Sequence, residues 1–434
     1  MPLKILITGA GIAGTTLAYL LAHSPSHHPK TTYNILILER SPTLRTTGLQ
    51  IDLRYPGIQV LKHMNLEEEF RAISIPEQRL ALVDGKGRRW GYFPVNGSGE
   101  GKQSFTTEWE VMRGEFCGLV GKGSGGGVRY EFGIWVEEVH ELDGDDGVEV
   151  VLSDGRREKF DIVVGADGLG SRMRGMMMTG ANYGDVTGKE GVHDLGVYAG
   201  YFTVNREMED GEGYDATGFI ATNGRGIMTR RHERERYLVY LMCRAVGEGE
   251  GIERGKRGDM EKEKEILKKS FRGAGWKTEE ILTGMDEAED FYCERMGVVN
   301  LERWSRGRVV LLGDAAYCPS VMTGMGTSCA MAGAYILAGE MGRLGRDGMV
   351  TKEDIEGVLA RYEEKLRPFM THVQRGLLDN NDYMGKFPSS ALGIGVMYFL
   401  IAVASFFKLD VLVRWVLRED TNGWKLPEYP DVFG

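Results

Sequence analysis

The pattern of apolar and polar positions predicts an alternating α/β arrangement at the N-terminus. Residues 4–8 form a short apolar, β-branched run, and leucines at positions 17, 20 and 21 recur at helical spacing after it. Three glycines lie between the two patterns, within residues 9–14. A second apolar run at 34–38 ends in Glu39. The predicted order is therefore strand, tight turn, helix and strand, as in a doubly wound parallel sheet.

The three glycines have the spacing of a dinucleotide-binding turn. Gly9 permits the tight turn, Gly11 lets a pyrophosphate reach backbone N–H groups at the helix N-terminus, and Gly14 lets the helix pack closely on the strand. Glu39 is suited to accept hydrogen bonds from a ribose. The alternative is a glycine-rich turn in another kind of doubly wound protein. These residues alone do not distinguish NAD from FAD.

The middle of the chain predicts a β-rich lobe. Two helical patterns, at 261–270 and 278–285, follow a series of apolar or alternating runs at 196–204, 216–222, 226–230 and 237–243. Side chains two residues apart in a strand share a face, so Tyr201 lies beside Thr203 and Met228 beside Arg230. Each face either lines a substrate pocket or belongs to ordinary sheet packing or to solvent.

Two later segments again combine a strand, glycines and an acidic residue. Residues 160–175 read FDIVVGADGLGSRMRG, and residues 308–334 read RVVLLGDAAYCPSVMTGMGTSCAMAGA. With the N-terminal motif they form a specific set. From residue 3 to about 370 the chain resembles the FAD-dependent monooxygenases of the aromatic-hydroxylase type, similar to para-hydroxybenzoate hydroxylase. The resemblance is to the branch that includes tetracycline-modifying monooxygenases and many fungal enzymes.

The resemblance implies a tightly but non-covalently bound FAD and indicates its contacts. Asp314 is expected to bind the ribityl chain, and Gly326 and Thr327 to open a helix whose dipole stabilises the anionic reduced flavin. Arg113 is expected over the diphosphate. Asp167 is expected near the cofactor and the nicotinamide, or else as a turn-capping residue, because Asp-Gly is a common turn pair. The expected cofactor-binding set is completed by Gly9, Gly11, Gly14, Glu39, Arg40, Arg45 and Gly324.

Residues 45–53 look like the segment that lies beside the isoalloxazine ring in this family. We favour Arg45 over Asp52 as the contact with the ring. The alternative for Asp52 and Arg54 is a solvated salt bridge on a loop, which contributes little.

The chain also departs from the family pattern in the late motif. The family commonly has His where this chain has Tyr317, and an Asn and an Asp where it has Ser328 and Gly333. These departures bear on the fine positioning of the flavin.

The predicted fold class is α/β, with a Rossmann-like FAD-binding domain, a β-sheet substrate lobe and C-terminal helices. Residues 1–175 are expected to form the first part of the FAD-binding domain, with a substrate-contacting segment at about 45–110. The remaining expected parts are a β-rich substrate lobe at 176–290, the second part of the FAD-binding domain at 291–375, and an apolar helical region at 376–434.

The implied activity is that of an FAD-dependent monooxygenase that uses NADPH or NADH as a transient donor and O2 as co-substrate. Its expected substrate is a small aromatic or polyketide-like molecule of fungal secondary metabolism, hydroxylated or epoxidised and contacted by Tyr201, Met228 and Arg230. No catalytic acid or base is singled out by spacing. One alternative is an FAD-dependent dehydrogenase or reductase that inserts no oxygen, and another is a non-catalytic flavin-binding sensor.

Charge and composition narrow the possible partners. The net charge of −10, with Lys and Arg interleaved among Asp and Glu, argues against nucleic acid. The run Gly121–Gly127 is expected to be a flexible turn and not a second nucleotide loop. The five cysteines are widely spaced and the histidines match no ligand pattern, so neither disulfides nor a metal site are expected.

The uncharged run at 391–407 is at the lower edge of the length that spans a bilayer. A packed C-terminal helix is favoured over membrane insertion or surface anchoring. With its unpaired cysteines, the chain is expected to be cytoplasmic. Whether it is a monomer or a homodimer is left open.

Overall fold

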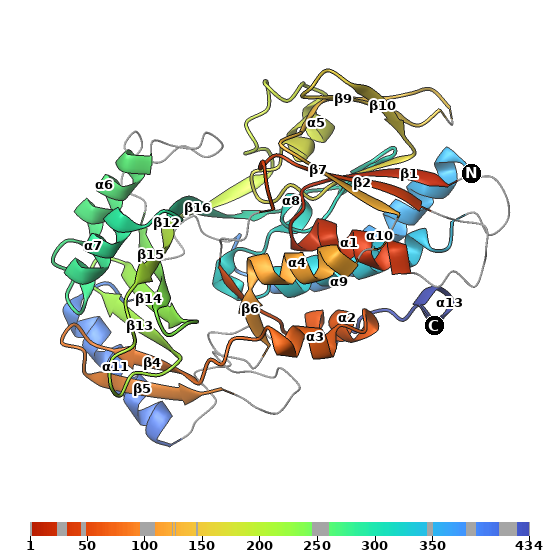
Figure 1. Ribbon diagram of the computed structural model, residues 1–434. Coiled ribbons are helices and arrows are strands. Elements are labelled where there is room, and N and C mark those ends of the chain that lie inside the picture. The colour runs from red at the N-terminus through yellow and green to blue at the C-terminus, as the bar shows by residue number, and fades with distance from the viewer. Residues whose placement is uncertain are drawn as a thin grey trace.

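The computed structural model shows two bodies connected by long strands (Figure 1). It describes residues 2–23, 33–44, 49–95, 109–123, 125, 127–144, 146–244, 260–344, 350–378, 388–407 and 423–433. Arg45 lies outside the described residues, so its expected contact with the flavin ring stays a prediction.

The first body is built on a six-stranded sheet with the order β17-β18-β11-β1-β2-β7. All neighbours pair in parallel except β17 with β18. β1 lies between β11 and β2, so the strand order reverses at β1 and opens a crevice at its carboxyl end. The strands are β1 (Leu3–Thr8), β2 (Tyr33–Glu39), β7 (Val128–Phe132), β11 (Ile162–Gly165), β17 (Ser305–Arg306) and β18 (Val309–Leu311).

Helices pack around this sheet and bury its apolar side chains. α1 contacts both α4 and α9, and α9 is buried over almost its whole length. These helices are α1 (Ile12–His23), α2 (Gly57–His63), α3 (Glu67–Ala72), α4 (Arg113–Gly123), α5 (Arg172–Thr179), α8 (Asp314–Tyr317), α9 (Gly326–Met341) and α10 (Lys352–Val373), with a 3-10 turn η1 (Val321–Thr323).

The prediction of a flexible turn at Gly121–Gly127 was wrong for residues 121–123, which are helical. The helix that begins at Arg113 continues through Gly123. It can do so because its apolar face, with Phe116 and Val120 fully buried, packs against the core and offsets the low helix propensity of glycine.

Two small sheets complete the first body. One has the order β10-β9-β8 and the other pairs β3 with β6. Their strands are β8 (Val136–Glu141), β9 (Val148–Leu152), β10 (Arg157–Phe160), β3 (Gln50–Asp52) and β6 (Glu110–Met112).

The second body is a seven-stranded sheet with the order β16-β12-β15-β14-β13-β4-β5. The predicted strands and both helices of the middle region are present. The sheet also takes in β4 and β5 from earlier in the chain and β16, which ends at Val299, beyond the expected limit at residue 290. Its elements are β4 (Arg79–Val83), β5 (Arg89–Pro94), β12 (Val192–Asn205), β13 (Asp215–Ala221), β14 (Arg225–Arg231), β15 (Arg236–Arg244), β16 (Tyr292–Val299), α6 (Met260–Phe271) and α7 (Thr278–Glu287).

The two faces of this sheet bury different partners. One face, with Phe202 and Val239, packs on α6 and α7 through Leu267 and Ile281. The opposite face packs against side chains of the first body, including Met112. This second face is therefore the inner face, between the two bodies.

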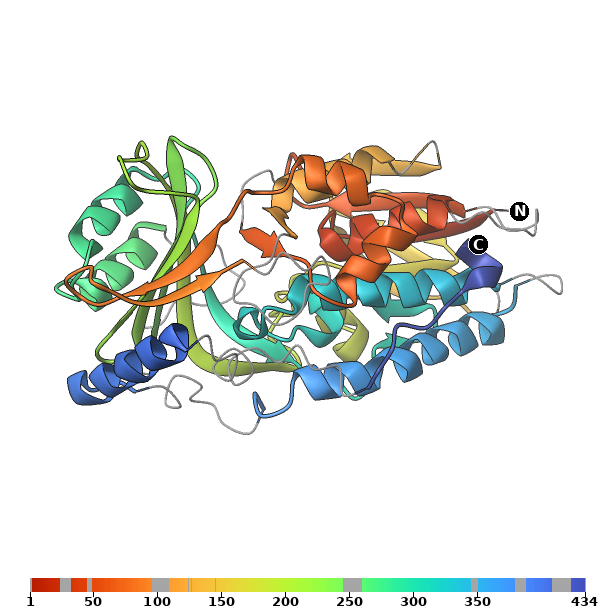
Figure 2. The same ribbon diagram turned by 90° about the horizontal axis from the view of Figure 1, so that it is seen from below.

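The C-terminal region returns from the second body to the first. α11 (Ala391–Phe406) lies against β5, whereas α13 (Pro430–Phe433) lies beside the first body (Figure 2). The Tyr429 ring packs directly against Gly339, where a Cβ would lie 2.5 Å from the ring. None of the helices in the described ranges combines the length and apolarity needed to cross a bilayer.

Candidate active site

The N-terminal glycine loop has the geometry that its sequence predicts. Gly9 has a φ of +104°, and a Cβ there would lie 2.5 Å from the Ala166 carbonyl oxygen. A Cβ on Gly14 would lie 2.1 Å from the Gly9 carbonyl oxygen, so helix and turn touch at that point. A Cβ on Gly11 would meet no described atom within 4 Å. The loop is therefore closed on its protein side and open at Gly11, toward the crevice.

Glu39 lies at the end of β2, beside this loop. Its carboxylate accepts hydrogen bonds from the backbone N–H of Ala10, at 3.2 Å, and of Ser41, at 2.9 Å. The side chain is therefore held at the carboxyl edge of the sheet. Arg40 points elsewhere and donates to the Tyr183 hydroxyl at 3.0 Å on the exposed side.

The turn from β18 into α8 forms the opposite wall of the crevice. Gly313 has a φ of +65°, and a Cβ there would lie 2.8 Å from Ala13 Cβ, so this turn packs directly on α1. Asp314 begins α8. Burial raises the pKa of its carboxyl, while a hydrogen bond with Cys318 and the Arg174 charge oppose that rise.

Arg174, which the sequence did not single out, connects the middle motif with the late motif. Its guanidinium is fully buried and donates to backbone carbonyls of Glu190 (2.5 Å), Leu169 (2.8 Å), Gly188 (2.6 Å) and Ala315 (3.1 Å). The only signal in the sequence was an arginine within a conspicuous glycine motif. Its role is to fix the backbone beside Asp314.

Asp167 caps the start of α5, as the turn-capping alternative expects, and its expected contact with the cofactor stays a prediction. Its carboxylate accepts from the Ser171 hydroxyl at 2.5 Å and from the backbone N–H of Arg172 and Met173, at 2.8 and 3.2 Å. Both oxygens thus hold the first turn of α5. The Arg172 guanidinium lies over the Tyr183 ring, 5.1 Å from its centroid.

The start of α9 points its backbone N–H groups at open space. Gly324 has a φ of +64° and reverses the chain ahead of the helix. Within the described chain no side chain caps α9, and a Cβ on Gly326 would meet no atom within 4 Å. The N–H groups of the first turn, including that of Thr327, therefore remain available to a ligand.

The segment at 49–58 is attached to α9 and α4 by backbone contacts. The Ser328 hydroxyl accepts from the Arg54 N–H at 2.9 Å and donates to the Arg54 carbonyl at 3.0 Å. The backbone N–H of Arg113 donates to the Leu49 carbonyl at 3.1 Å. Ser328 thus has a defined partner where the family pattern has Asn.

The alternative of a solvated Asp52–Arg54 salt bridge is correct for the pair but wrong for its solvation. The pair forms, with 2.6 Å between Arg54 Nε and Asp52 Oδ2, but the Arg54 side chain is buried. It lies against the turn at Gly324, with Arg54 Nε 3.7 Å from where a Cβ on that residue would be. Burial makes this ion pair part of the wall between 49–58 and the start of α9.

Tyr317 and Gly333 replace the family's His and Asp as a matched pair. A Cβ on Gly333 would lie 1.9 Å from the Tyr317 hydroxyl oxygen, so the tyrosine fills the space that a side chain at 333 would occupy. The Tyr362 hydroxyl and the Tyr317 hydroxyl are hydrogen-bonded at 3.2 Å. Both rings pack on Trp304.

We expect Gly333→Ala to lower the free energy of unfolding by about 2 kcal/mol, because overpacking a rigid core costs that order of energy. Tyr317→Phe removes the oxygen that the new methyl group would meet, so the double variant should recover part of the loss. Urea unfolding of the three variants measures this coupling. Strict additivity of the two single changes would contradict the matched-pair interpretation.

The inner face of the seven-stranded sheet carries the three residues predicted to contact substrate. Tyr201 is buried there and donates to Glu294 at 3.2 Å. Met228 packs partly buried on the same cluster. Arg230 is buried and pairs bidentately with Glu77 at 2.9 Å for each contact, and also with Glu110.

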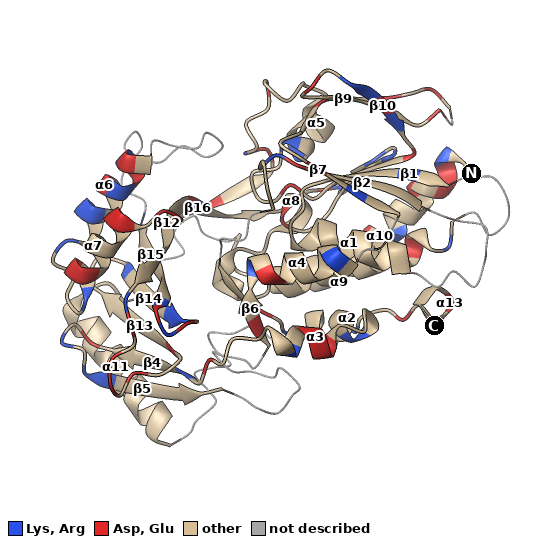
Figure 3. Cartoon of the chain, viewed as in Figure 1, with Lys and Arg blue, Asp and Glu red and all other residues tan. Residues whose placement is uncertain are grey.

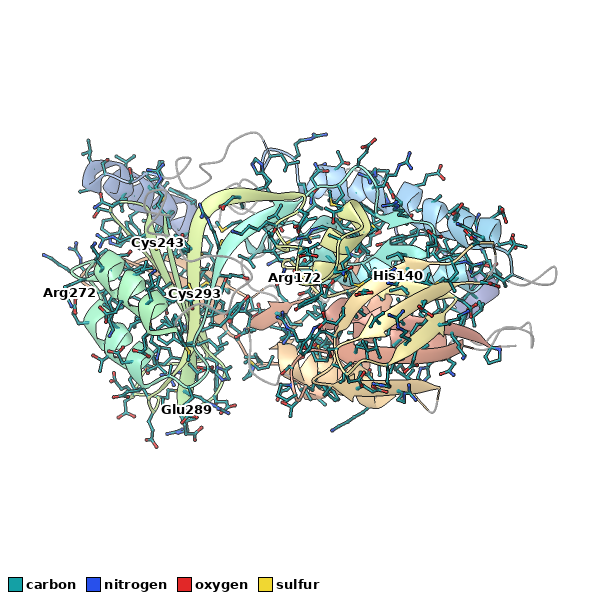
Figure 4. All side chains as sticks on the ribbon, turned by 90° about the horizontal axis from the view of Figure 1, so that it is seen from above. His140, Arg172, Cys243, Arg272, Glu289 and Cys293 are labelled. Atoms are coloured by element: carbon teal, nitrogen blue, oxygen red, sulfur yellow. The ribbon has the colours of Figure 1, made fainter. Side chains whose placement is uncertain are left out.

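The five cysteines form no disulfide. Cys243 and Cys293 both lie in the second body (Figure 4), and all five cysteines are free thiols. Among the described residues, no three His, Cys, Asp or Glu side chains are grouped so as to hold a metal ion.

Comparison with known proteins assigns this site to a family. Residues 124–376 match the FAD binding domain family model. The FAD-dependent monooxygenase asL4 of Sarocladium schorii is 39% identical over 440 residues, 99% of each chain. The flavin-dependent monooxygenase eupH of a Phoma species is 36% identical over 447 residues, covering 100% of this chain and 98% of the relative. The crystal structure of tetracycline destructase Tet(51) has a TM-score of 0.73 at 26% identity, covering 99% of this chain and all of that one.

The chain therefore belongs to the FAD-dependent monooxygenases, and FAD is its cofactor. Three features fit FAD: the open face at Gly11, the carboxylates of Glu39 and Asp314 on opposite walls, and the uncapped start of α9. The predicted fold class, a FAD-binding body with a β-sheet lobe, is confirmed.

Proposed function

We propose that this enzyme uses NADPH or NADH and O2 to hydroxylate or epoxidise a small aromatic or polyketide-like molecule in fungal secondary metabolism. The named activities of asL4 and eupH support oxygen insertion. The observation that carries the proposal is the convergence of three separate chain segments, 9–14, 313–314 and 324–327, on one crevice beside an apolar sheet face. We place this activity in the cytoplasm, in a monomer or a homodimer.

Different residues around the crevice bind different parts of FAD. Gly9, Gly11 and Gly14 give the diphosphate access to the N-terminus of α1, with Arg113 as its cation, and Glu39 accepts from the adenosine ribose. Asp314 accepts from the ribityl chain. Gly324 and Gly326 bring the α9 N-terminus, with Thr327, to the end of the flavin that is anionic when reduced. When bound, FAD supplies hydride acceptance and the activation of O2.

The inner sheet face is the proposed substrate side. Its apolar side chains exclude water, which protects reactive oxygen species from wasteful decay. Tyr201 and Met228 contribute to the substrate contacts. Arg230 is engaged by two carboxylates, so it contributes position and hydrogen-bond donors, not a free positive charge. The FAD-binding parts at 1–175 and 291–375 and the substrate lobe at 176–290 remain our proposed division of the chain, with β4, β5 and β16 contributed to the sheet of the lobe.

The test is a product-mass experiment on the purified holoenzyme with 18O2, NADPH or NADH, and a panel of phenols and polyketide-like aromatics. Incorporation of one labelled oxygen into product supports the proposal. A product that differs only in hydrogen indicates a dehydrogenase, and tight FAD without substrate-stimulated nicotinamide oxidation indicates a sensor. Asp314→Ala, which removes one proposed FAD contact, serves as the control with reduced flavin content.

A further inference from the structure

α11 presents its apolar side outward, unlike the other long helices at the surface. Leu392 is 82% exposed and Phe406 is 81% exposed. Four further apolar side chains of this face are each more than half exposed: Val396, Phe399, Leu400 and Phe407. The helix itself carries no charged residue. By contrast, α10 exposes Glu353, Asp354, Glu356 and Arg361. Figure 3 shows the difference in colour, with α11 wholly tan.

The orientation of α11 is fixed by its opposite side. The Tyr398 hydroxyl donates to the Val83 carbonyl at 2.6 Å and accepts from the Ile220 N–H at 3.0 Å. The Ser405 hydroxyl accepts from the Tyr92 N–H and donates to the Tyr92 carbonyl, each at 3.0 Å, and so covers the free edge of β5. Ile401 packs on the sheet. The exposed residues therefore form one side of a helix whose opposite side is fixed on the sheet.

The β4–β5 hairpin contacts α11 through Tyr398, which donates to the Val83 carbonyl and lies beside Trp90, and its turn is rich in basic residues. The helix itself carries no acidic residue. The turn between β4 and β5, next to α11, exposes Lys86, Arg88 and Arg89, while Asp84 pairs with Arg88 at 2.8 Å. Soluble monomers rarely expose contiguous apolar patches above a few hundred Å². An apolar face with aromatic side chains beside a basic turn is the chemistry that binds an anionic lipid surface.

We propose that α11 binds in the plane of an anionic membrane surface, with Leu392, Val396, Phe399, Leu400, Phe406 and Phe407 entering the lipid and the β4–β5 turn contacting headgroups. The helix has 16 residues, about 24 Å at 1.5 Å per residue, and one side of it is occupied by the sheet. It therefore lies on the membrane and does not cross it. A second copy of the chain fits less well, because the helix offers no acidic group to the basic turn of a partner.

The proposal is tested by vesicle flotation of the full-length holoenzyme. Vesicles of pure phosphatidylcholine are compared with vesicles containing about one third phosphatidylserine. We expect flotation with the anionic vesicles and a decrease of at least tenfold in the vesicle-bound fraction for F399S/L400S. Phe132→Ser with Met178→Ser removes two exposed apolar side chains elsewhere and should change nothing. Lys86→Glu with Arg89→Glu should abolish the preference for anionic vesicles.

Several outcomes would overturn the proposal. If the parent protein fails to float with either vesicle, the face does not bind lipid. If light scattering shows a dimer that F399S/L400S converts to monomer, a second copy covers the face. Equal flotation of F399S/L400S and the parent would assign the binding to another surface. Flavin content and nicotinamide oxidation should be the same in the parent and F399S/L400S, because neither residue lies at the FAD site, and this shows that the variant is folded.

Discussion

Gly14→Ala is expected to yield a protein that unfolds more easily and retains little flavin. The added Cβ would lie 2.1 Å from the Gly9 carbonyl oxygen and 3.1 Å from Ile7 Cγ2. The first contact is with backbone, which cannot move aside without opening the turn between β1 and α1. We expect a loss of about 3 kcal/mol in the free energy of unfolding, at the upper end for overpacked cores. Urea unfolding and the flavin-to-protein absorbance ratio measure both effects.

Gly11→Ala is the matched variant with the opposite pattern. A Cβ at Gly11 meets no described atom within 4 Å, and its φ is not in the left-handed region, so the fold accommodates alanine. The apoprotein should be as stable as the parent or slightly more stable, because alanine reduces the entropy of the unfolded chain. FAD affinity should nevertheless fall at least tenfold, about 1.4 kcal/mol, since the methyl group occupies the space needed by the diphosphate. Unchanged FAD affinity would show that the diphosphate does not approach Gly11.

The local motifs of the FAD-binding body were readable from sequence because their chemistry is local. Gly9, Gly11 and Gly14 lie within a turn of six residues, and each is needed there because a side chain would clash or block access. Glu39 is the last residue of its strand. The same holds for Gly313 and Asp314, where strand, turn and helix are consecutive. In each case the residue type and its neighbours already define the geometry.

Roles that depend on contacts between distant segments were not readable. Arg174 binds the Ala315 carbonyl, 141 residues away, and no periodicity signals that contact. Ser328 binds the backbone of Arg54, 274 residues away. In the sequence, Tyr317 and Gly333 looked like two separate departures from the family pattern. Their contact in the structure shows that the larger side chain at 317 occupies the space left by the missing side chain at 333. The burial of Arg54 was missed for the same reason.

Arg230→Met is expected to be strongly destabilising, although Arg230 was singled out only as a substrate contact. In the parent its guanidinium pairs with Glu77 and Glu110, and the Gln50 amide donates to both carboxylates, at 3.0 Å to Glu77. Both carboxylate side chains are fully buried. Removing the Arg230 guanidinium leaves two buried carboxylates without this ion-pair partner, which typically costs about 3–5 kcal/mol. Thermal and urea unfolding of the apoprotein and holoprotein measure the loss.

Arg236→Met is the control on the adjacent strand. Its partner Glu233 is at 2.6 Å, but both side chains are largely solvated, so the expected change is within about 1 kcal/mol. Glu110→Gln combined with Arg230→Met removes one of the uncompensated charges and should restore part of the stability. Equal losses for Arg230→Met and Arg236→Met would contradict the buried-cluster interpretation.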